Sequence, residues 1–406
     1  MDNVTHSLFG YALARVLPKP ASGQLPYHSA FMWTSVLASN VPDLDLLLRL
    51  VADDPKLAYL MHHRGHTHTV VWAIPLGVAV AYACARAHRI RAPREIAPIV
   101  GVGVLAVLFH LAFDALNNYG VHPFYPFDNR WYYGDFVFIV EPLLLAALVP
   151  MLFSSSAWLS RGVGAVLVAT LAYLLVGTSL LTPVTAYAML FVLLAAAGVA
   201  ARLKPPAYVH LGVVAAVASL YFATGRIAEA YLQRDAQAVF PRERFVDIVR
   251  TPYPGNPVCW SGVTVSVDHH GVYRVRKAAL SLLPTVVSAP ACPLFPKASS
   301  TAPLAEGRVH SGPMAVFGKA FAAPLAELGK VKAECRGAGA LTFMRAPFWA
   351  TVDGKRVVGD LRYDREPGLG FAEVPLEGSC SDPIPPWIPP RSDLLSALSG
   401  PEGTKD

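Results

Sequence analysis

The sequence predicts a mainly α-helical protein, in which a polytopic membrane domain of about six to seven spans precedes a smaller β-rich extramembrane domain. Of its 406 residues, 54% are hydrophobic and 15% are charged, whereas a soluble domain carries about 25% charged residues. The charges are also uneven, because no Asp or Glu occurs between Glu141 and Glu229. We therefore expect a membrane domain, a β-rich domain and a Pro/Ser-rich tail at residues 1–225, 226–382 and 383–406.

The expected membrane domain opens with two helical patterns that differ from simple spans. Residues 4–17 predict a helix, capped by Asp2 or Asn3, that is too short to cross a bilayer. Residues 29–51 are apolar, but their Asn, Pro and Asp residues are costly in lipid unless they face a protein interior. The stretches that are long and apolar enough to span a membrane are 69–86, 97–116, 136–153, 162–181, 184–201 and 207–224.

The basic residues between these spans predict the orientation of the chain. Short loops rich in Lys and Arg stay in the cytoplasm, so the outer face of the membrane would receive residues 62–68, 117–135 and everything after 225. These loops account for the net charge of +6, and without a basic patch interleaved with aromatic residues no nucleic-acid partner is expected. No removable signal peptide is expected, because the N-terminus lacks a basic region and a cleavage motif. The basic loops alternate along the chain and lie at residues 86–94, 161 and 202–204.

Residues after 225 are expected to form β-structure held by disulfides. Alternating apolar residues at 263–275 and 348–358 surround turn residues, which predicts two hairpins. Four of the five cysteines fall in this region, and in an exported domain they predict two disulfides with three alternative pairings. The alternative is a cytosolic domain with four unpaired thiols. These cysteines are Cys259, Cys292, Cys335 and Cys380, and the fifth, Cys84, lies in an expected span.

Four histidines within seven residues, from His62 to His68, carry the strongest chemical signal in the chain. Neutral imidazole is the commonest protein ligand for zinc, and a turn entering a helix can aim His63 and His68 at one ion. Arg64 adds a fork of donors suited to a phosphate or a carboxylate. Two other pairs have the four-residue spacing that places both groups on one helix face. These pairs and the nearby carboxylates are Asp2 with His6, His110 with Asp114, and Asp43 with Asp45.

Each candidate ligand also has a structural alternative. His6 alone would suit a hydrogen-bonded position in the core. His110 and Asp114 would suit a buried polar pair that locks two spans together, although a charged residue in a span favours a functional role. Asp43 and Asp45 would suit the capping or ending of a helix after a proline.

Three further residues are expected near the site without binding an ion directly. Glu141 is a candidate for holding a ligating histidine or acting as a general base. Its alternative role is to cap a span before Pro142. His62 and His66 are expected to support the site or to face solvent.

Ordered motifs in the first 145 residues give the sequence a family resemblance. They are Met1-Asp2-x-x-Thr5-His6-x-x-x-Gly10, Pro42-Asp43-Leu44-Asp45, His63-Arg64-Gly65-x-Thr67-His68, His110-x-x-x-Asp114 and Phe138-Ile139-Val140-Glu141-Pro142. With these motifs the chain resembles the YdjM-like family of metal-dependent hydrolases of the bacterial inner membrane, some members of which carry a LexA-binding label. That family is in turn distantly similar to zinc-dependent phospholipases C and single-strand nucleases, which are helical enzymes with a metal cluster.

The resemblance implies a divalent metal ion as cofactor, with zinc expected first and manganese or iron as alternatives. The similar enzymes take ligands from a His-x-x-x-Asp pair on one helix, which corresponds here to His110 and Asp114. The implied ligands are His6, Asp45, His63, His68, His110 and Asp114, with Asp2 and Asp43 as additional candidates.

We therefore expect a membrane-embedded metal-dependent hydrolase that acts on a phosphoester or lipid-type substrate through metal-activated water. Arg64 would clamp a phosphate oxygen, and bilayer lipids are the expected partners. One alternative is a membrane transporter or proton relay that uses the same His/Asp cluster. Another is a protein whose metal ion is purely structural. A LexA partner is not expected, because it would be cytoplasmic whereas the soluble domain is predicted to lie outside.

Overall fold

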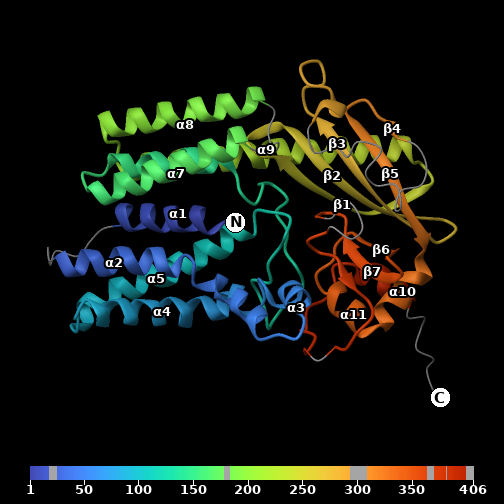
Figure 1. Ribbon diagram of the computed structural model, residues 1–406, viewed down its shortest axis with the longest axis horizontal. Coiled ribbons are helices and arrows are strands. Elements are labelled where there is room, and N and C mark those ends of the chain that lie inside the picture. Colours follow the sequence, from blue (N-terminus) through green and yellow to red (C-terminus); the bar gives the residue numbers. More distant parts are fainter. Residues whose placement is uncertain (18–24, 178–182, 293–308, 364–369, 381, 399–406) are drawn as a thin grey trace.

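The structure, a computed structural model, consists of a helical bundle beside a β-rich region (Figure 1). It describes residues 1–17, 25–177, 183–292, 309–363, 370–380 and 382–398. The helices of the bundle run roughly side by side, and the β-rich region lies at one end of them. They are α1 (Asn3–Val16), α2 (Leu25–Ala38), α4 (Val70–Ala87), α5 (Pro93–Asp114), α7 (Trp158–Gly177), α8 (Pro183–Leu203) and α9 (Ala207–Val239).

Among the described residues, five helices are long and apolar enough to cross a membrane, namely α4, α5, α7, α8 and α9. The expected count of six to seven spans is therefore not confirmed. Residues 136–153, which were expected to form one span, contain two short helices, α6 (Pro142–Leu148) and η3 (Val149–Ser154). Each has a proline at its start, where the missing N–H is tolerated. Together they fall short of the roughly 20 residues that a span requires.

The basic loops lie at the end of the bundle that faces away from the β-rich region (Figure 1). The first connects α4 to α5, and the third connects α8 to α9. The second basic position, Arg161, lies in the first turn of α7. The course of the chain thus agrees with the alternation of basic loops in the sequence. The opposite end of the bundle carries the short elements η1 (Val41–Leu50), α3 (Pro55–His62) and η2 (His66–His68).

Helix α9 joins the bundle to the β-rich region. It continues without a break for 33 residues, so the boundary expected at residue 225 falls inside a helix. Near its C-terminal end Leu232 is fully buried against the sheet. Its methyl groups pack on Gly262 so closely that a Cβ atom at this position would lie 3.2 Å from one of them. The two parts are therefore connected by a continuous helix and a shared apolar core.

The β-rich region contains two antiparallel sheets. The five-stranded sheet has the order β1-β2-β3-β5-β4, and the three-stranded sheet has the order β6-β7-β8. Both expected hairpins are confirmed, since β2 pairs with β3 and β6 pairs with β7. The strands are β1 (Glu243–Tyr253), β2 (Asn256–Asp268), β3 (Val272–Ser281), β4 (His310–Ser311), β5 (Ala315–Pro324), β6 (Pro347–Val352), β7 (Lys355–Asp360) and β8 (Val374–Pro375). The helices are η4 (Ala289–Ala291), α10 (Leu325–Ala333), α11 (Cys335–Leu341) and α12 (Ser392–Leu398).

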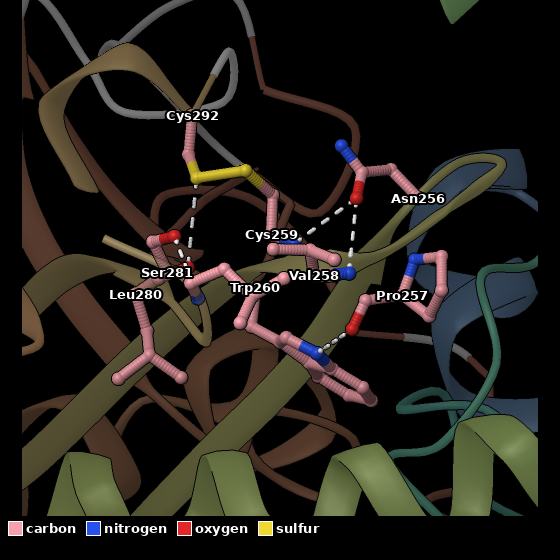
Figure 2. Close-up of a disulfide and its surroundings, with 9 residues drawn as sticks. Asn256, Pro257, Val258, Cys259, Trp260, Leu280, Ser281 and Cys292 are labelled. Carbon is pink, nitrogen blue, oxygen red and sulfur yellow. Dashed lines mark hydrogen bonds between the residues drawn. A yellow bond between two sulfur atoms is a disulfide. The ribbon is translucent and has the colours of Figure 1, made fainter. Parts of the chain in front are cut away.

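Two disulfides staple this region, as its four cysteines predict. Cys259 at the start of β2 pairs with Cys292 (Figure 2), and Cys335 pairs with Cys380. The turn before Cys259 is also fixed, because the Asn256 side chain accepts hydrogen bonds from Val258 N and Cys259 N (Figure 2). The sequence had left three pairings open, and the fold selects one of them.

The segment expected to be a loose tail packs against the protein over its described part. Trp387 is buried, and its indole N–H donates to Met61 O at 2.9 Å. Helix α12 then packs against α10. Proline-rich composition therefore did not prevent ordered packing, because one large aromatic side chain anchors the segment.

Candidate metal centre

Carboxylates and imidazoles from three separate parts of the chain meet at the end of the bundle next to the β-rich region. Asp43 comes from η1, His68 from η2, and His110 and Asp114 from the last turn of α5. On a helix the four-residue spacing stacks His110 and Asp114 on one face, and both are 1% exposed. These four residues form the first of two groups that could hold a metal ion.

The four candidate ligand atoms all lie within 4.8 Å of one another. His68 Nε2 lies 3.1 Å from His110 Nε2 and 3.3 Å from Asp114 Oδ2. Asp43 Oδ1 lies 3.4 Å from His68 Nε2 and 3.6 Å from His110 Nε2, and His110 Nε2 lies 3.4 Å from Asp114 Oδ2. A tetrahedral zinc ion with bonds of about 2.0 to 2.2 Å needs ligand atoms about 3.3 to 3.6 Å apart. The spacing therefore suits one tetrahedral divalent ion.

Both imidazole rings are turned so that Nε2 points to this centre. His110 Nδ1 donates to Ser39 O at 2.7 Å. His68 Nδ1 lies 3.2 Å from Asp45 Oδ2 and 3.0 Å from Thr67 Oγ1. A hydrogen bond at one ring nitrogen fixes the tautomer and frees the other nitrogen for a metal. Without an ion, one Nε2 would have to carry a proton and donate it in a hydrogen bond to the Nε2 of the other ring.

Asp45 organises the loop around His68. It accepts from His63 Nδ1 at 2.9 Å, Arg64 N at 3.0 Å and Thr67 Oγ1 at 2.8 Å. Burial favours a higher pKa, but the hydrogen bonds from His63 and His68 hold the pKa of Asp45 below its ordinary value. Asp45 is thus an ionised carboxylate that orients a ligand, and it also forms a second candidate group with Asp43 and His63.

Arg64 is buried beside the cluster. Its guanidinium donates to Asp114 Oδ1 and Asn117 Oδ1, both at 3.0 Å, and lies 4.6 Å from the centre of the Tyr119 ring. The residue reaches inward from a left-handed backbone conformation with φ of 61°. These contacts fix the Asp114 carboxylate, and they occupy donors that were expected to clamp a phosphate.

The cluster carries an excess of negative charge. Asp43, Asp45 and Asp114 are buried carboxylates, while Arg64 and the amino group of Met1 contribute positive charges next to Asp114. Buried carboxylates must be paired or bind a cation. One carboxylate oxygen, Asp114 Oδ2, has no hydrogen-bond partner among the described residues. The charge and the unpartnered oxygen both favour a bound cation.

The N-terminal helix supports the centre from one side. His6 Nε2 lies 3.3 Å from Asp114 Oδ1, and its ring stacks on His110 with centroids 3.9 Å apart. Asn3 Nδ2 donates to Asp43 Oδ2 at 2.8 Å. Asp2 instead caps α1 by accepting from Thr5 N at 2.9 Å. His6 and Asp2 therefore lie outside both candidate metal groups.

Glu141 makes the contacts of its alternative role, which is to cap a helix. Its side chain caps α6 by accepting from Leu143 N at 3.1 Å, and it also accepts from Gly255 N at 3.0 Å. Burial raises its pKa to about 7, against the effect of these hydrogen bonds. Neither contact joins Glu141 to the metal centre, so the structure places it in the capping role.

Sequence patterns alone did not single out several residues that shape the centre. Asn117, Asn3 and the Ser39 carbonyl orient Arg64, Asp43 and His110 respectively. The i, i+3 spacing of Asn3 and His6 on one helix was an available signal, whereas a backbone carbonyl leaves none in the sequence. His62 is half-buried and His66 is exposed, and both lie outside the candidate groups, as expected.

Comparison with known proteins supports the family resemblance for the N-terminal part of the chain. Residues 1–184 match the model of the YdjM inner membrane protein family. The chain is also similar to the uncharacterized protein YfhP of Bacillus subtilis (strain 168), with 25% identity over 179 residues. The aligned part covers 44% of this chain and 52% of that protein, so the chain spans about half the length of this relative. No solved structure shows a significant match.

Proposed function

We propose that this chain, whose first 184 residues match the YdjM inner membrane protein family, is a membrane-embedded metal-dependent hydrolase. The substrate would be a phosphoester, most simply that of a membrane lipid. The observation that carries the proposal is the set of four buried atoms, from Asp43, His68, His110 and Asp114, at the spacing of a tetrahedral ion.

A divalent ion held by these residues would lower the pKa of a bound water and supply hydroxide near neutral pH. The residues of the chain would supply position and charge. Asp45 would keep the His68 ring turned, and Arg64 would hold Asp114 in place. Of the four candidate ligands, Asp43 is the most exposed, at 9%. Asp43 is thus the ligand whose movement would open a coordination position for water.

A second candidate function is a structural metal site. Four protein ligands close the coordination of zinc in structural sites, whereas catalytic sites keep one position open. The transporter alternative is less favoured, because the cluster lies at the end of α5 and in short elements beyond the spans. Transporter sites lie near the midplane of the bilayer on broken helices.

We further propose that the centre faces the outer side of the bacterial inner membrane. The basic loops lie at the opposite end of the bundle (Figure 1), and such loops stay in the cytoplasm. The β-rich region beside the centre carries two disulfides, which persist in oxidising compartments.

The test is metal content measured by elemental analysis of detergent-purified protein, followed by hydrolysis assays on phosphodiesters and lipid phosphates. Wild type should bind a divalent ion near stoichiometrically, and His68→Ala and His110→Ala should lose it. His62→Ala and His66→Ala, from the same segment but outside the candidate groups, are the matched controls and should keep it.

Three outcomes separate the candidate functions. Folded wild type without metal, after reconstitution with excess zinc, manganese or iron, would rule out the hydrolase and the structural site together. Stoichiometric metal with hydrolysis that disappears in His68→Ala would support the hydrolase. Stoichiometric metal without hydrolysis of any tested phosphoester, and with a large loss of thermal stability on chelation, would favour the structural site.

A further inference from the structure

The short helix that supplies Asp43 also exposes a row of leucines. Residues of a 3₁₀-helix recur on one edge every third position, and Leu44, Leu47 and Leu50 of η1 follow this spacing. Their side chains are 57%, 56% and 72% exposed. The opposite side of η1 buries Asp43 and Asp45 at the metal centre. One short element thus has a polar side at the centre and an apolar leucine edge on the outside.

This leucine edge belongs to an element that packs directly against two of the spans, α4 and α5. Helix η1 packs against α2, α3, α4 and α5. At the near end of α4, Val71, Trp72 and Ile74 are also exposed. An apolar edge at the end of a membrane bundle lies at the depth where acyl chains meet headgroups. Lipid is therefore the occupant that this surface fits.

A pocket of about 820 Å³ opens next to the leucine edge. Its lining combines cations with apolar and aromatic side chains, which suits an anionic amphiphile. Its basic members are Arg49 and Lys56, and one donor of Lys56 is used by Gly370 O at 2.7 Å. Leu50 belongs to both the leucine edge and the pocket. The lining residues are Arg49, Leu50, Pro55, Lys56, Tyr59 and Phe371.

The pocket reaches toward the metal centre through one aromatic side chain. The Tyr59 ring stacks on His63 with centroids 4.8 Å apart, and His63 Nδ1 binds Asp45 Oδ1 at 2.9 Å. The nearest acidic residues on the same segment are Asp53 and Asp54, which do not line the pocket. Asp54 is moreover paired with Arg336. The pocket is thus a basic vestibule that is one aromatic ring away from a candidate metal group.

We propose that this vestibule is the headgroup site for an anionic glycerophospholipid of the surrounding bilayer. The phosphate would lie between Arg49 and Lys56, and the acyl chains would follow the leucine edge. This inference rests on the proposed function, because it names the substrate class of the same centre. It also explains why a cation pair and an apolar edge lie together on η1 and α3.

The test is native mass spectrometry of full-length protein in detergent with phosphatidylglycerol or phosphatidylcholine added. Metal is removed beforehand with a chelator, so that no lipid is consumed. Wild type should retain phosphatidylglycerol in preference to phosphatidylcholine. The variant Arg49→Gln/Lys56→Gln should lose about fivefold in phosphatidylglycerol retention for each cation removed. Equal retention by the variant and wild type would overturn the proposal.

Two further variants control for charge and for the apolar edge. Arg86→Gln/Arg91→Gln removes two exposed cations at the other end of the bundle and should retain phosphatidylglycerol as wild type does. An equal loss in that variant would show a general charge effect and overturn the assignment. Leu44→Ser/Leu47→Ser should weaken retention of both lipids, and unchanged retention would contradict the acyl-chain path. Displacement of lipid by inorganic phosphate would show a site for the free anion instead.

The vestibule and the metallohydrolase can fail separately. Metal binding and lipid hydrolysis without any effect of Arg49→Gln/Lys56→Gln on lipid retention would remove the vestibule and leave the proposed function. Selective phosphatidylglycerol retention by a protein that binds no metal would keep the vestibule and remove the hydrolase.

Discussion

His68 and His110 face each other with their Nε2 atoms 3.1 Å apart, and each ring places its Nδ1 against an oxygen acceptor. Two ring nitrogens at this distance need a proton or a cation between them, since two lone pairs would repel. The carboxylates of Asp43 and Asp114 on either side favour a cation. The pair therefore marks the position that a metal ion could fill.

The orientation of His68 predicts a strong effect of Asp45→Asn. The amide keeps the shape of the side chain but removes the charge that faces His68 Nδ1 and His63 Nδ1. Loss of such a supporting carboxylate lowers metal affinity by about 10- to 100-fold. Competition with a chromophoric chelator measures the affinity. Asp353→Asn, in the exposed turn between β6 and β7, is the control and should change nothing. Unchanged affinity in Asp45→Asn would contradict the role assigned to Asp45.

Arg64→Lys separates a positioning role from a substrate clamp. Lysine keeps the charge but cannot reproduce the fork that joins Asp114 to Asn117. We expect the variant to lose about 1.5 to 3 kcal/mol of unfolding free energy, together with metal affinity. Thermal unfolding of the metal-free protein and chelator competition measure the two effects. Arg130→Lys, at an exposed ion pair with Asp128, should cost almost nothing. An unchanged unfolding midpoint with a reduced turnover number would instead support the phosphate clamp.

Features that depend on adjacent residues could be predicted from the sequence. The choice between two nearby candidate ligands could not. The spacing of His110 and Asp114 predicts a shared helix face, and alternation predicts the hairpin of β2 with β3; both depend on a few adjacent residues. Asp43 and Asp45 are two residues apart on η1, and the sequence does not show which of them belongs to the four-residue candidate group. That choice depends on how η1 packs against η2 and α5.

Two features that the sequence did not reveal have the same physical origin. Residues 136–153 are as apolar as a span, but hydropathy does not show where a helix stops and a new one starts. Arg64 has the right chemistry for a phosphate, but Asn117 and Asp114 are already placed within its reach. In both cases tertiary contacts decide the outcome, and composition contains no record of them.

Glu141 predicts a pH dependence of stability. Burial raises its pKa from an ordinary value of 4.5 to about 7, so the folded protein keeps a proton that the unfolded chain releases. The contribution of Glu141 to the free energy of unfolding should therefore be largest below pH 4.5 and should fall as the pH rises toward 7, by about 1.4 kcal/mol per pH unit. In Glu141→Gln this fall should be absent. Unfolding midpoints in detergent at pH 5, 6, 7 and 8 measure the effect.

The control for this experiment is Glu95→Gln, which removes a carboxyl group at the other end of the bundle. It should retain the pH dependence of wild type. A difference between the wild-type and Glu141→Gln midpoints that stays constant between pH 5 and 7 would contradict the raised pKa of Glu141.

The two disulfides and the basic loops predict one orientation in the membrane, with the β-rich region outside the cytoplasm. Cells are lysed directly into denaturant that contains an alkylating reagent, one sample is then reduced and alkylated again, and the mass of the protein in both samples is measured by mass spectrometry. Cys84 is the free thiol and four cysteines are paired. One alkylation is therefore expected without reduction, and four more after it.

Alkaline phosphatase, which is active only after export, should be active when fused after residue 398 and inactive in the loop between α4 and α5. Five free thiols together with the reverse reporter pattern would place the β-rich region in the cytoplasm, where a reducing environment keeps thiols unpaired. The metal centre would then face the cytoplasm as well, because it lies at the same end of the bundle (Figure 1).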